Sequence, residues 1–193
     1  VMKQVSIGAD GTLWALNTSL AGILRWSGSG WDAVPGQLTQ ISVGSAEHVW
    51  GVNAANEIFR WNGSDWTRMP GAMAQVSTGS DGTVWAIDAP GNVYRWTGST
   101  WEKVPGQLKH ISVGSADHIW GTNFQDRIFR RTGSGWQGLP GLLKEVSVSA
   151  DGVAWGVNAA NNIFYWTSAT WQVIDGLLVN ISVGPSVGER HLQ

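Results

Sequence analysis

The sequence predicts an all-β fold: a β-propeller of four-stranded antiparallel blades made from five repeats of about 35 residues. Three observations predict it. A triplet with serine between two β-branched residues recurs six times at a near-constant spacing, and all 14 tryptophans fall on three periodic positions. Short apolar segments alternate with turns rich in Gly, Asn, Asp and Ser, and helical periodicity is absent, so we expect almost no helix.

Serine and tryptophan define the period. The triplets are centred on Ser6, Ser42, Ser77, Ser112, Ser147 and Ser182. One tryptophan series comprises Trp14, Trp50, Trp85, Trp120 and Trp155, and a second comprises Trp31, Trp66, Trp101, Trp136 and Trp171. The third comprises Trp26, Trp61, Trp96 and Trp166 and is interrupted by Arg131.

One unit is predicted to be a four-stranded antiparallel meander. Its segments 40–43, 49–53, 58–61 and 66–69 are rich in Ile, Val, Phe and Trp, which favours strands. Loops of Gly, Asn, Asp and Ser separate them and adopt tight turns at little cost. We expect a Pro-Gly pair to carry the chain to the next blade. The pairs are Pro35-Gly36, Pro70-Gly71, Pro105-Gly106 and Pro140-Gly141, with Asp175-Gly176 in the fifth unit.

Both sides of the predicted sheet carry large side chains. In the third segment, Ile58 and Arg60 share one side, while Phe59 and Trp61 share the other. A sheet that is covered on both sides must pack between two others, and a ring of blades satisfies this requirement. The Trp14 series, in the second strand, is expected to form the core between blades.

Counting the units gives one domain with five blades. The repeats are expected at about 3–36, 37–71, 72–106, 107–141 and 142–176, followed by a surplus strand and tail at 177–193. The surplus strand at 181–183 closes the ring or begins an incomplete sixth blade, so a six-bladed ring is the alternative.

Composition excludes several classes of function. The formal net charge is -2, so there is no cationic field for nucleic acid. There is no cysteine, which excludes disulfides and thiolate chemistry, and no apolar run is long enough to cross a membrane. We expect no cofactor and no metal. Localisation stays open between the cytoplasm and non-classical secretion, and homo-oligomer formation stays open as well.

The unit resembles the tectonin repeat. The resemblance lies in Ile-Ser-Val-Gly, Ser-Asp-Gly-Thr, Val-Trp-Gly-Val-Asn, Asn-Ile-Phe-Arg-Trp and Thr-Gly-Ser-x-Trp, and it covers nearly the whole chain. It implies a β-propeller lectin that binds bacterial lipopolysaccharide or O-methylated sugars in defence or agglutination. Animal proteins with similar repeats serve in membrane trafficking, so the alternative is a non-enzymatic scaffold for protein partners.

Two groups of residues are candidates for glycan binding. Tryptophan offers a flat apolar face to a pyranose, and neighbouring guanidinium and amide groups hydrogen-bond hydroxyls. One group ends the third strand, and the other lies in the turns between strands two and three and between strands four and one. The candidates are Arg60, Trp61, Arg95, Trp96 and Trp166 in the first group, and Asn53, Asn56, Gln107, Asn123, Asn158 and Asn161 in the second. Turn formation is the competing interpretation for the asparagines.

A second, two-blade period is visible in the turn between the first two strands. Odd units carry Asp-Gly, whereas Glu47-His48 and Asp117-His118 occupy the even ones. No third ligand recurs with these pairs, so we expect solvated turns rather than metal or acid–base chemistry. No unit holds a nucleophile–base or carboxylate pair of its own, and a binding protein is therefore expected rather than an enzyme.

Overall fold

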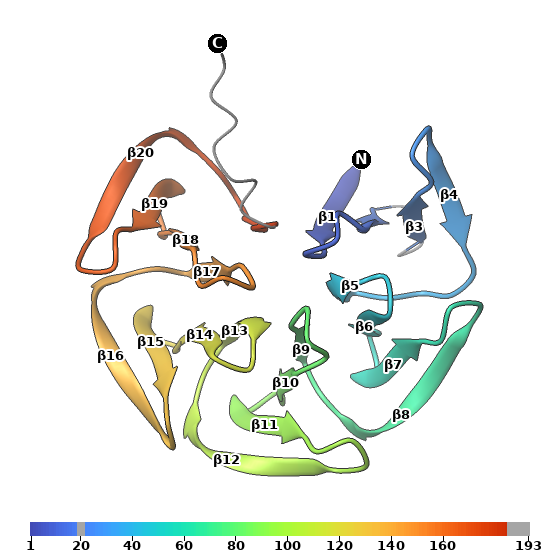
Figure 1. The fold of residues 1–193 in the computed structure, drawn as a ribbon, viewed down its shortest axis with the longest axis horizontal. Helices are drawn as coiled ribbons and strands as arrows, with labels where there is room; N and C mark the ends of the chain where they lie inside the picture. The colour runs from blue at the N-terminus through green and yellow to red at the C-terminus, as the bar shows by residue number, and fades with distance from the viewer. Residues whose placement is uncertain (19–21, 185–193) are drawn as a thin grey trace.

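The computed structural model describes residues 1–18 and 22–184, which form twenty strands in five four-stranded antiparallel sheets (Figure 1). No helix occurs among these residues, and none is therefore long and apolar enough to cross a membrane. The predicted fold class, an all-β propeller with five blades, is confirmed.

The strands follow one another in chain order within each blade. Blade 1 holds β1 (Met2–Ile7), β2 (Leu13–Asn17), β3 (Ile23–Trp26) and β4 (Trp31–Val34). Blade 2 holds β5 (Gln40–Ser45), β6 (His48–Val52), β7 (Glu57–Trp61) and β8 (Trp66–Ala72). Blade 3 holds β9 (Gln75–Thr78), β10 (Val84–Ile87), β11 (Asn92–Trp96) and β12 (Trp101–Gln107). Blade 4 holds β13 (His110–Ser115), β14 (His118–Thr122), β15 (Arg127–Thr132) and β16 (Gly135–Leu142). Blade 5 holds β17 (Glu145–Val148), β18 (Ala154–Val157), β19 (Asn162–Trp166) and β20 (Trp171–Leu177).

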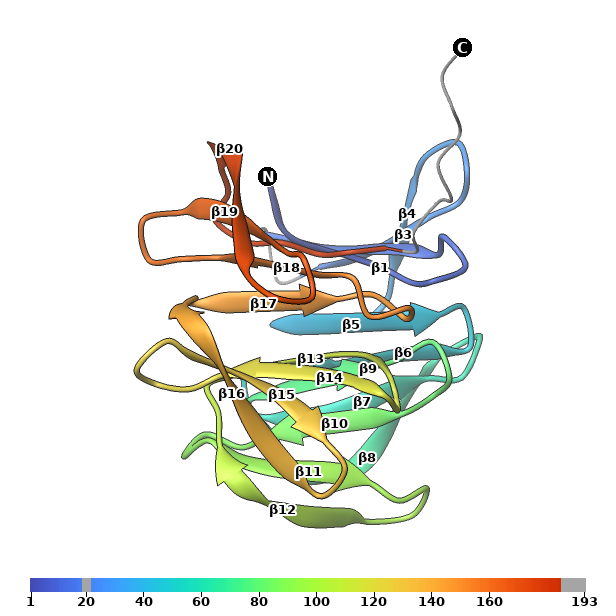
Figure 2. The same ribbon diagram turned by 60° about the vertical axis from the view of Figure 1, so that its left-hand side comes forward.

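The inner strands β1, β5, β9, β13 and β17 lie side by side around the axis (Figures 1 and 2). The repeated serine explains how they are joined. The amide of Val43 donates to Ser6 Oγ at 3.0 Å, and the amide of Val113 donates to Ser77 Oγ at 2.9 Å. Neighbouring inner strands belong to different sheets, and side-chain hydroxyls satisfy these amides.

Each blade buries both of its sides, as the alternation in the third strand predicts. Ile58 packs into the apolar cluster between blades 2 and 3. Phe59 and Trp61 pack into the cluster between blades 1 and 2. Among the described residues, the buried core therefore consists of four clusters between blades rather than one central core.

The Pro-Gly pairs of blades 2 to 4 do not form the connecting turns that we expected. Pro70 and Gly71 lie inside β8, opposite a register shift between Glu57 and Ile58. Gly71 has a φ of 94°, which a bulge in the fourth strand requires. The connection to the next blade follows this bulge.

The ring is open between blades 5 and 1 (Figure 1). Residues 181–183 take the place of a sixth inner strand, because the amide of Val183 donates to Ser147 Oγ at 3.0 Å. The predicted surplus strand does not form there, since the described residues supply no second strand to pair with it. Val5 is 38% exposed at this open flank, whereas Ile41, its counterpart in blade 2, is 1% exposed.

Candidate functional site

The candidate residues lie on opposite faces of the ring. Each third strand begins at the turn after the second strand and ends at the turn before the fourth strand. We call the face with the second-to-third turns the asparagine face, and the opposite face, with the first-to-second and third-to-fourth turns, the hairpin face. Asn53, Asn56, Gln107, Asn123, Asn158 and Asn161 lie on the asparagine face, whereas Arg60, Trp61, Arg95, Trp96 and Trp166 lie toward the hairpin face. The two groups therefore do not form one site.

Asparagines at the start of the second-to-third turns organise those turns. Asn53 Oδ1 accepts the amides of Ala55 and Glu57 at 3.0 and 2.9 Å. Asn123 Oδ1 accepts two amides at 3.0 Å, and Asn158 Oδ1 accepts two at 3.0 and 2.9 Å, from the same positions of their turns. These oxygens are engaged in turn chemistry.

The later residues of these turns have backbone roles. Asn56 and Asn161 have φ values of 61° and 67°, a region that asparagine tolerates better than most residues. Asn161 Oδ1 also accepts a hydrogen bond from the ammonium group of Lys144. Gln107 ends β12, opposite Asn92, and is exposed.

At three junctions between blades, toward the hairpin face, three tryptophans form a cluster. Trp14 of blade 1 meets Trp61 and Trp66 of blade 2 edge to face, with ring centroids 5.3 and 5.7 Å apart. The equivalent clusters are Trp50, Trp96 and Trp101 between blades 2 and 3, and Trp120, Trp166 and Trp171 between blades 4 and 5. We call these the junction clusters.

An arginine completes each of these three clusters. Arg60 lies over the Trp50 ring at 5.9 Å, because the two residues are paired across β6 and β7. Arg25 and Arg130 lie over Trp14 and Trp120 in the same way, both at 5.8 Å. Arg60 and Trp61 are adjacent in the chain but belong to different junctions, because successive side chains of a strand point to opposite sides. The arginine and the tryptophan of one Arg-Trp dipeptide therefore do not contribute to the same junction.

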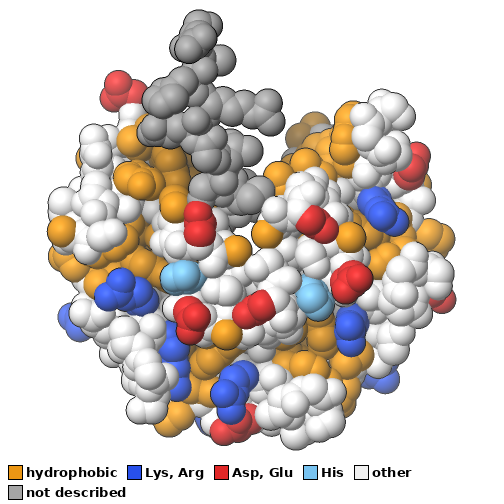
Figure 3. Space-filling view, in the orientation of Figure 1, with side chains coloured by type: hydrophobic (Ala, Val, Ile, Leu, Met, Phe, Trp, Pro, Cys, Tyr) orange, Lys and Arg blue, Asp and Glu red, His pale blue; other side chains and the backbone are white. Residues whose placement is uncertain are grey.

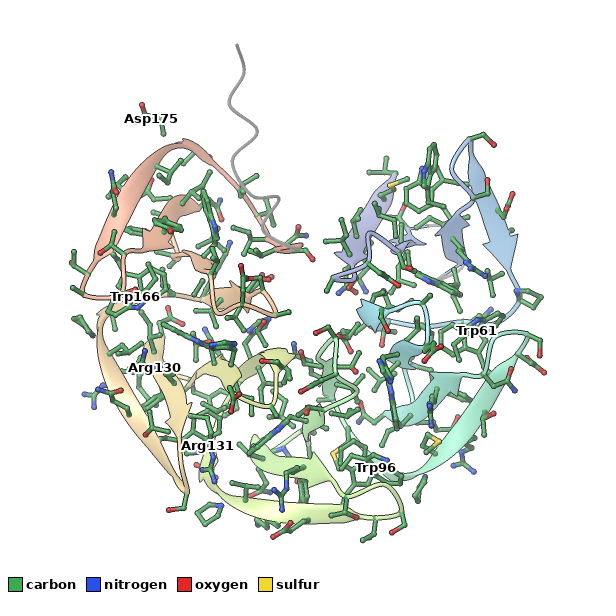
Figure 4. All side chains as sticks on the ribbon, viewed as in Figure 1. Trp61, Trp96, Arg130, Arg131, Trp166 and Asp175 are labelled. Carbon is green, nitrogen blue, oxygen red and sulfur yellow. The ribbon has the colours of Figure 1, made fainter. Side chains whose placement is uncertain are left out.

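The junction between blades 3 and 4 is different. Arg131 takes the place of the missing tryptophan and lies over Trp85 and Trp136, at 5.5 and 5.6 Å from the ring centroids. Figure 4 shows Trp61, Trp96, Arg131 and Trp166 at corresponding places, each on the flank that faces the preceding blade.

This junction contains a cleft of about 480 Å³. The residues that line it include Thr83, Trp85, Arg95, Trp96 and Arg131. Arg95 is the predicted candidate whose side chain shares this junction with Trp85, whereas the ring of its neighbour Trp96 packs on Trp50 at the preceding junction. The break in the tryptophan series at Arg131 was visible in the sequence, but the opening it creates depends on the neighbouring blade.

The cleft is electropositive. Burial lowers the pKa of Arg131, and the nearby charge of Arg95 lowers it further. Nη1 of Arg131 is buried and has no hydrogen-bond partner within residues 1–18 and 22–184. Arg95 forms an ion pair with Glu102 at 2.6 Å, and about half of each of these side chains is exposed.

The axial channel carries a second set of polar side chains. Gln4, Gln40 and Gln75 each bond the backbone of the next inner strand through both amide atoms. His110 and Glu145 occupy the next two places, with Nε2 and Oε1 4.0 Å apart. Burial lowers the pKa of His110 to about 4 and raises that of Glu145. Among the described residues, no three His, Cys, Asp or Glu side chains form a group that could hold a metal ion.

The two-blade period marks hydrogen bonds between neighbouring blades. Glu47 and Asp117 are exposed, as expected for solvated turns, whereas the histidines that follow them are half-buried and contact the next blade. Asp81 Oδ2 of blade 3 accepts the amide of Ala116 of blade 4 at 2.7 Å. Nδ1 of His118 in turn lies 2.9 Å from the carbonyl oxygen of Ala150 in blade 5. Asp10 and His48 make the equivalent contacts from blades 1 and 2. Figure 3 shows acidic and histidine side chains gathered around the centre of the face turned to the viewer.

Comparison with known proteins gives related sequences and related folds. Tectonin-1 of Physarum polycephalum is 41% identical over 59 residues, which are 30% of this chain and 27% of Tectonin-1. The virginiamycin B lyase of Staphylococcus aureus has a similar structure, with a TM-score of 0.66, 20% identity, and coverage of 88% of this chain and 68% of the lyase. The SapL1 lectin in complex with alpha methyl fucoside has a TM-score of 0.60 and 16% identity, covering 92% of this chain and 80% of the lectin.

At these identities, the two solved structures establish a shared propeller fold and nothing about chemistry. The sequence evidence goes further, because the Tectonin domain family matches residues 1–64, 47–132 and 114–188. Together these segments include all five blades. The chain belongs to the tectonin family.

Proposed function

We propose that this protein is a multivalent lectin that binds glycans at the junctions between its blades, and that it is not an enzyme. The observation that carries the proposal is the repetition of the junction clusters. In each cluster, the tryptophan of the fourth strand is partly exposed. It lies near an arginine that stacks on the tryptophan of the second strand. Indole faces suit the apolar face of a pyranose, and guanidinium groups donate hydrogen bonds to its hydroxyls.

Repetition suits binding better than catalysis. Each shallow site would hold its sugar weakly, and several sites on one rigid ring would engage a glycan-coated surface together. A reaction instead needs one arranged constellation, which the near-equivalent junctions do not supply. We propose bacterial lipopolysaccharide or O-methylated glycans as the ligands, and innate defence or agglutination as the role, because these are what resemblance to the family implies.

A glycan array that carries methylated, bacterial and unmodified sugars tests the proposal. We expect binding that soluble ligand competes away. The double variant Arg60→Gln/Arg130→Gln removes the stacked cation from two junctions and should reduce apparent affinity at least tenfold with little loss of stability. Arg68→Gln is the control, since Arg68 is exposed and pairs with Glu57 outside the junctions.

The asparagine face is tested in parallel. Asn53→Ala/Asn158→Ala removes side chains that organise two turns on that face. If this variant loses binding and the arginine variant retains it, the site lies on the asparagine face and the junction proposal is wrong.

A scaffold for protein partners in membrane trafficking is the second candidate. The apolar open flank favours it, since Val5, Trp26 and Leu178 are exposed there, whereas their counterparts in blade 2, Ile41, Trp61 and Leu38, are buried. An array without any binding would favour the scaffold.

A further inference from the structure

We propose that the cleft between blades 3 and 4 binds an acidic saccharide, whose carboxylate or phosphate group is held by Arg131 and Arg95. This inference rests on the proposed lectin function and assigns a distinct ligand chemistry to one junction. The other three interior junctions would take uncharged sugar units.

The position of Arg131 is the first argument. In the three other interior junctions, an indole occupies this place and packs on a tryptophan of the preceding blade. A guanidinium group between Trp85 and Trp136 keeps a favourable contact with both rings, but it does not fill the same volume. The substitution therefore produces both an opening and a positive charge at one place.

The unmet hydrogen bonding of Arg131 is the second argument. A buried charged donor without a partner is costly, so native structures normally supply an acceptor. Nη1 of Arg131 has none in the part of the chain that the structure describes. Arg131 also lines the cleft, and guanidinium groups bind carboxylates and phosphates in a bidentate geometry, so an anionic group in the cleft would compensate this charge.

Arg95 adds a second cation at the same junction. It is paired with Trp85 across β10 and β11, as Arg60 is paired with Trp50 in blade 2. Arg95 extends instead to Glu102, which is not among the residues that line the cleft. The cleft wall therefore carries two guanidinium groups and no carboxylate, and an anion between them would relieve their repulsion.

The remaining wall suits a sugar rather than a bare ion. Thr83 and Thr97 line the cleft and carry hydroxyl groups that suit the hydroxyls of a pyranose, whereas the Trp96 ring lies on the other side of β11, against Trp50 and Trp101. The volume of about 480 Å³ lies within the range of small-molecule sites.

The test uses the whole protein and four probes: glucuronate, glucose 6-phosphate, glucose and inorganic sulfate. Tryptophan fluorescence and calorimetry report binding. We expect glucuronate or glucose 6-phosphate to bind at least tenfold more tightly than glucose and than sulfate, with an affinity that falls as salt is added. Comparison of the two acidic sugars distinguishes a carboxylate ligand from a phosphate ligand.

Arg131→Trp is the decisive variant because it restores the residue that the four other blades carry, so it is expected to fold. It should abolish binding of acidic sugars and leave array binding of uncharged glycans intact. Arg131→Lys keeps the charge without the planar fork and should bind more weakly than the wild type. Arg68→Gln removes one positive charge outside the cleft and should change nothing.

The outcomes separate the two proposals. Equal affinity for glucuronate and glucose, sulfate binding as tight as that of the sugars, or acidic-sugar binding retained in Arg131→Trp would each overturn the acidic site. Array binding of uncharged glycans would still support the lectin in those cases. Loss of all array binding while glucuronate still binds would refute the multivalent junction sites and leave the acidic cleft standing.

Discussion

Trp26→Ala should cost far less stability than Trp61→Ala, although the two tryptophans occupy the same place in blades 1 and 2. Trp61 lies between blades, is 8% exposed and contacts both Trp14 and Trp66. Trp26 faces the open flank, is 39% exposed and contacts Trp31. The comparison therefore measures what one neighbouring blade contributes to a tryptophan.

The magnitude follows from the difference in burial. Subtracting the two exposed fractions, 39% and 8%, leaves 31% of the side chain. For an aromatic residue that buries at most ~250 Å², this is ~80 Å², or ~2 kcal/mol at ~25 cal/mol per Å². The additional contact of Trp61 with Trp14 adds about 1 kcal/mol. We expect Trp61→Ala to cost about 3–5 kcal/mol and Trp26→Ala about 3 kcal/mol less.

Urea unfolding followed by fluorescence measures both variants, and the expected difference corresponds to about 6–12 °C in Tm for a chain of this length. Sedimentation of each sample establishes that monomers are compared. Equal losses for the two monomeric variants would refute the reasoning, because they would mean that Trp26 is covered in solution as fully as Trp61.

Two further predictions concern the axis and the blade contacts. His110→Gln, which introduces the residue found at this place in blades 1 to 3, should remove a loss of stability that the wild type shows below neutral pH. The pKa of His110 in the folded protein is about 4, so between ordinary histidine titration near pH 6.5 and pH 4 only the unfolded chain gains this proton. The free energy of unfolding falls over that window by at most about 3 kcal/mol, and the raised pKa of Glu145 opposes the fall. If the free energy of unfolding in urea depends on pH equally in the wild type and in His110→Gln, His110 is not the cause of the fall. Gly114→Ala should cost about 3 kcal/mol or more in the same assay, because its Cβ would lie 1.9 Å from the carbonyl oxygen of Ser149 in the next blade. Gly135→Ala is the control, since its Cβ meets nothing within 4 Å, and equal losses would rule out the clash as the cause.

The fold was predictable because the same pattern of strands and turns occurs in all five repeats. Strand segments, turns and the need to bury both sides are all local properties of one unit, and five copies agree on them. The hydrogen bonds that join the units were not predictable in this way. That Ser77 Oγ would accept the amide of Val113 depends on how far apart two inner strands lie, which no single repeat specifies.

The candidate site was predictable in its residue types and less so in their grouping. Arg60 and Trp61 are adjacent in the sequence, but their side chains face different junctions. Arg60 stacks on Trp50 of the neighbouring strand, and Trp61 packs on Trp14 of the preceding blade. The sequence showed that Arg131 interrupts the tryptophan series, but it did not show that a cleft lies at that junction. Whether an arginine in that place stacks, pairs or opens a cleft is decided by Trp85 and Trp136, which come from the blades on either side of the junction.

A ring of repeats offers a physical reason why one junction can acquire a different chemistry. Each blade contacts its two neighbours and little else, so a substitution at one junction leaves the other junctions unchanged. Arg131 retains stacking on both Trp85 and Trp136, which limits the loss of stability from the missing indole. The fold therefore tolerates the exchange, and Arg131 lines the cleft in which we propose that an anionic ligand binds. In a protein with one central core, the same exchange would place an unpaired cation where it disrupts every element at once.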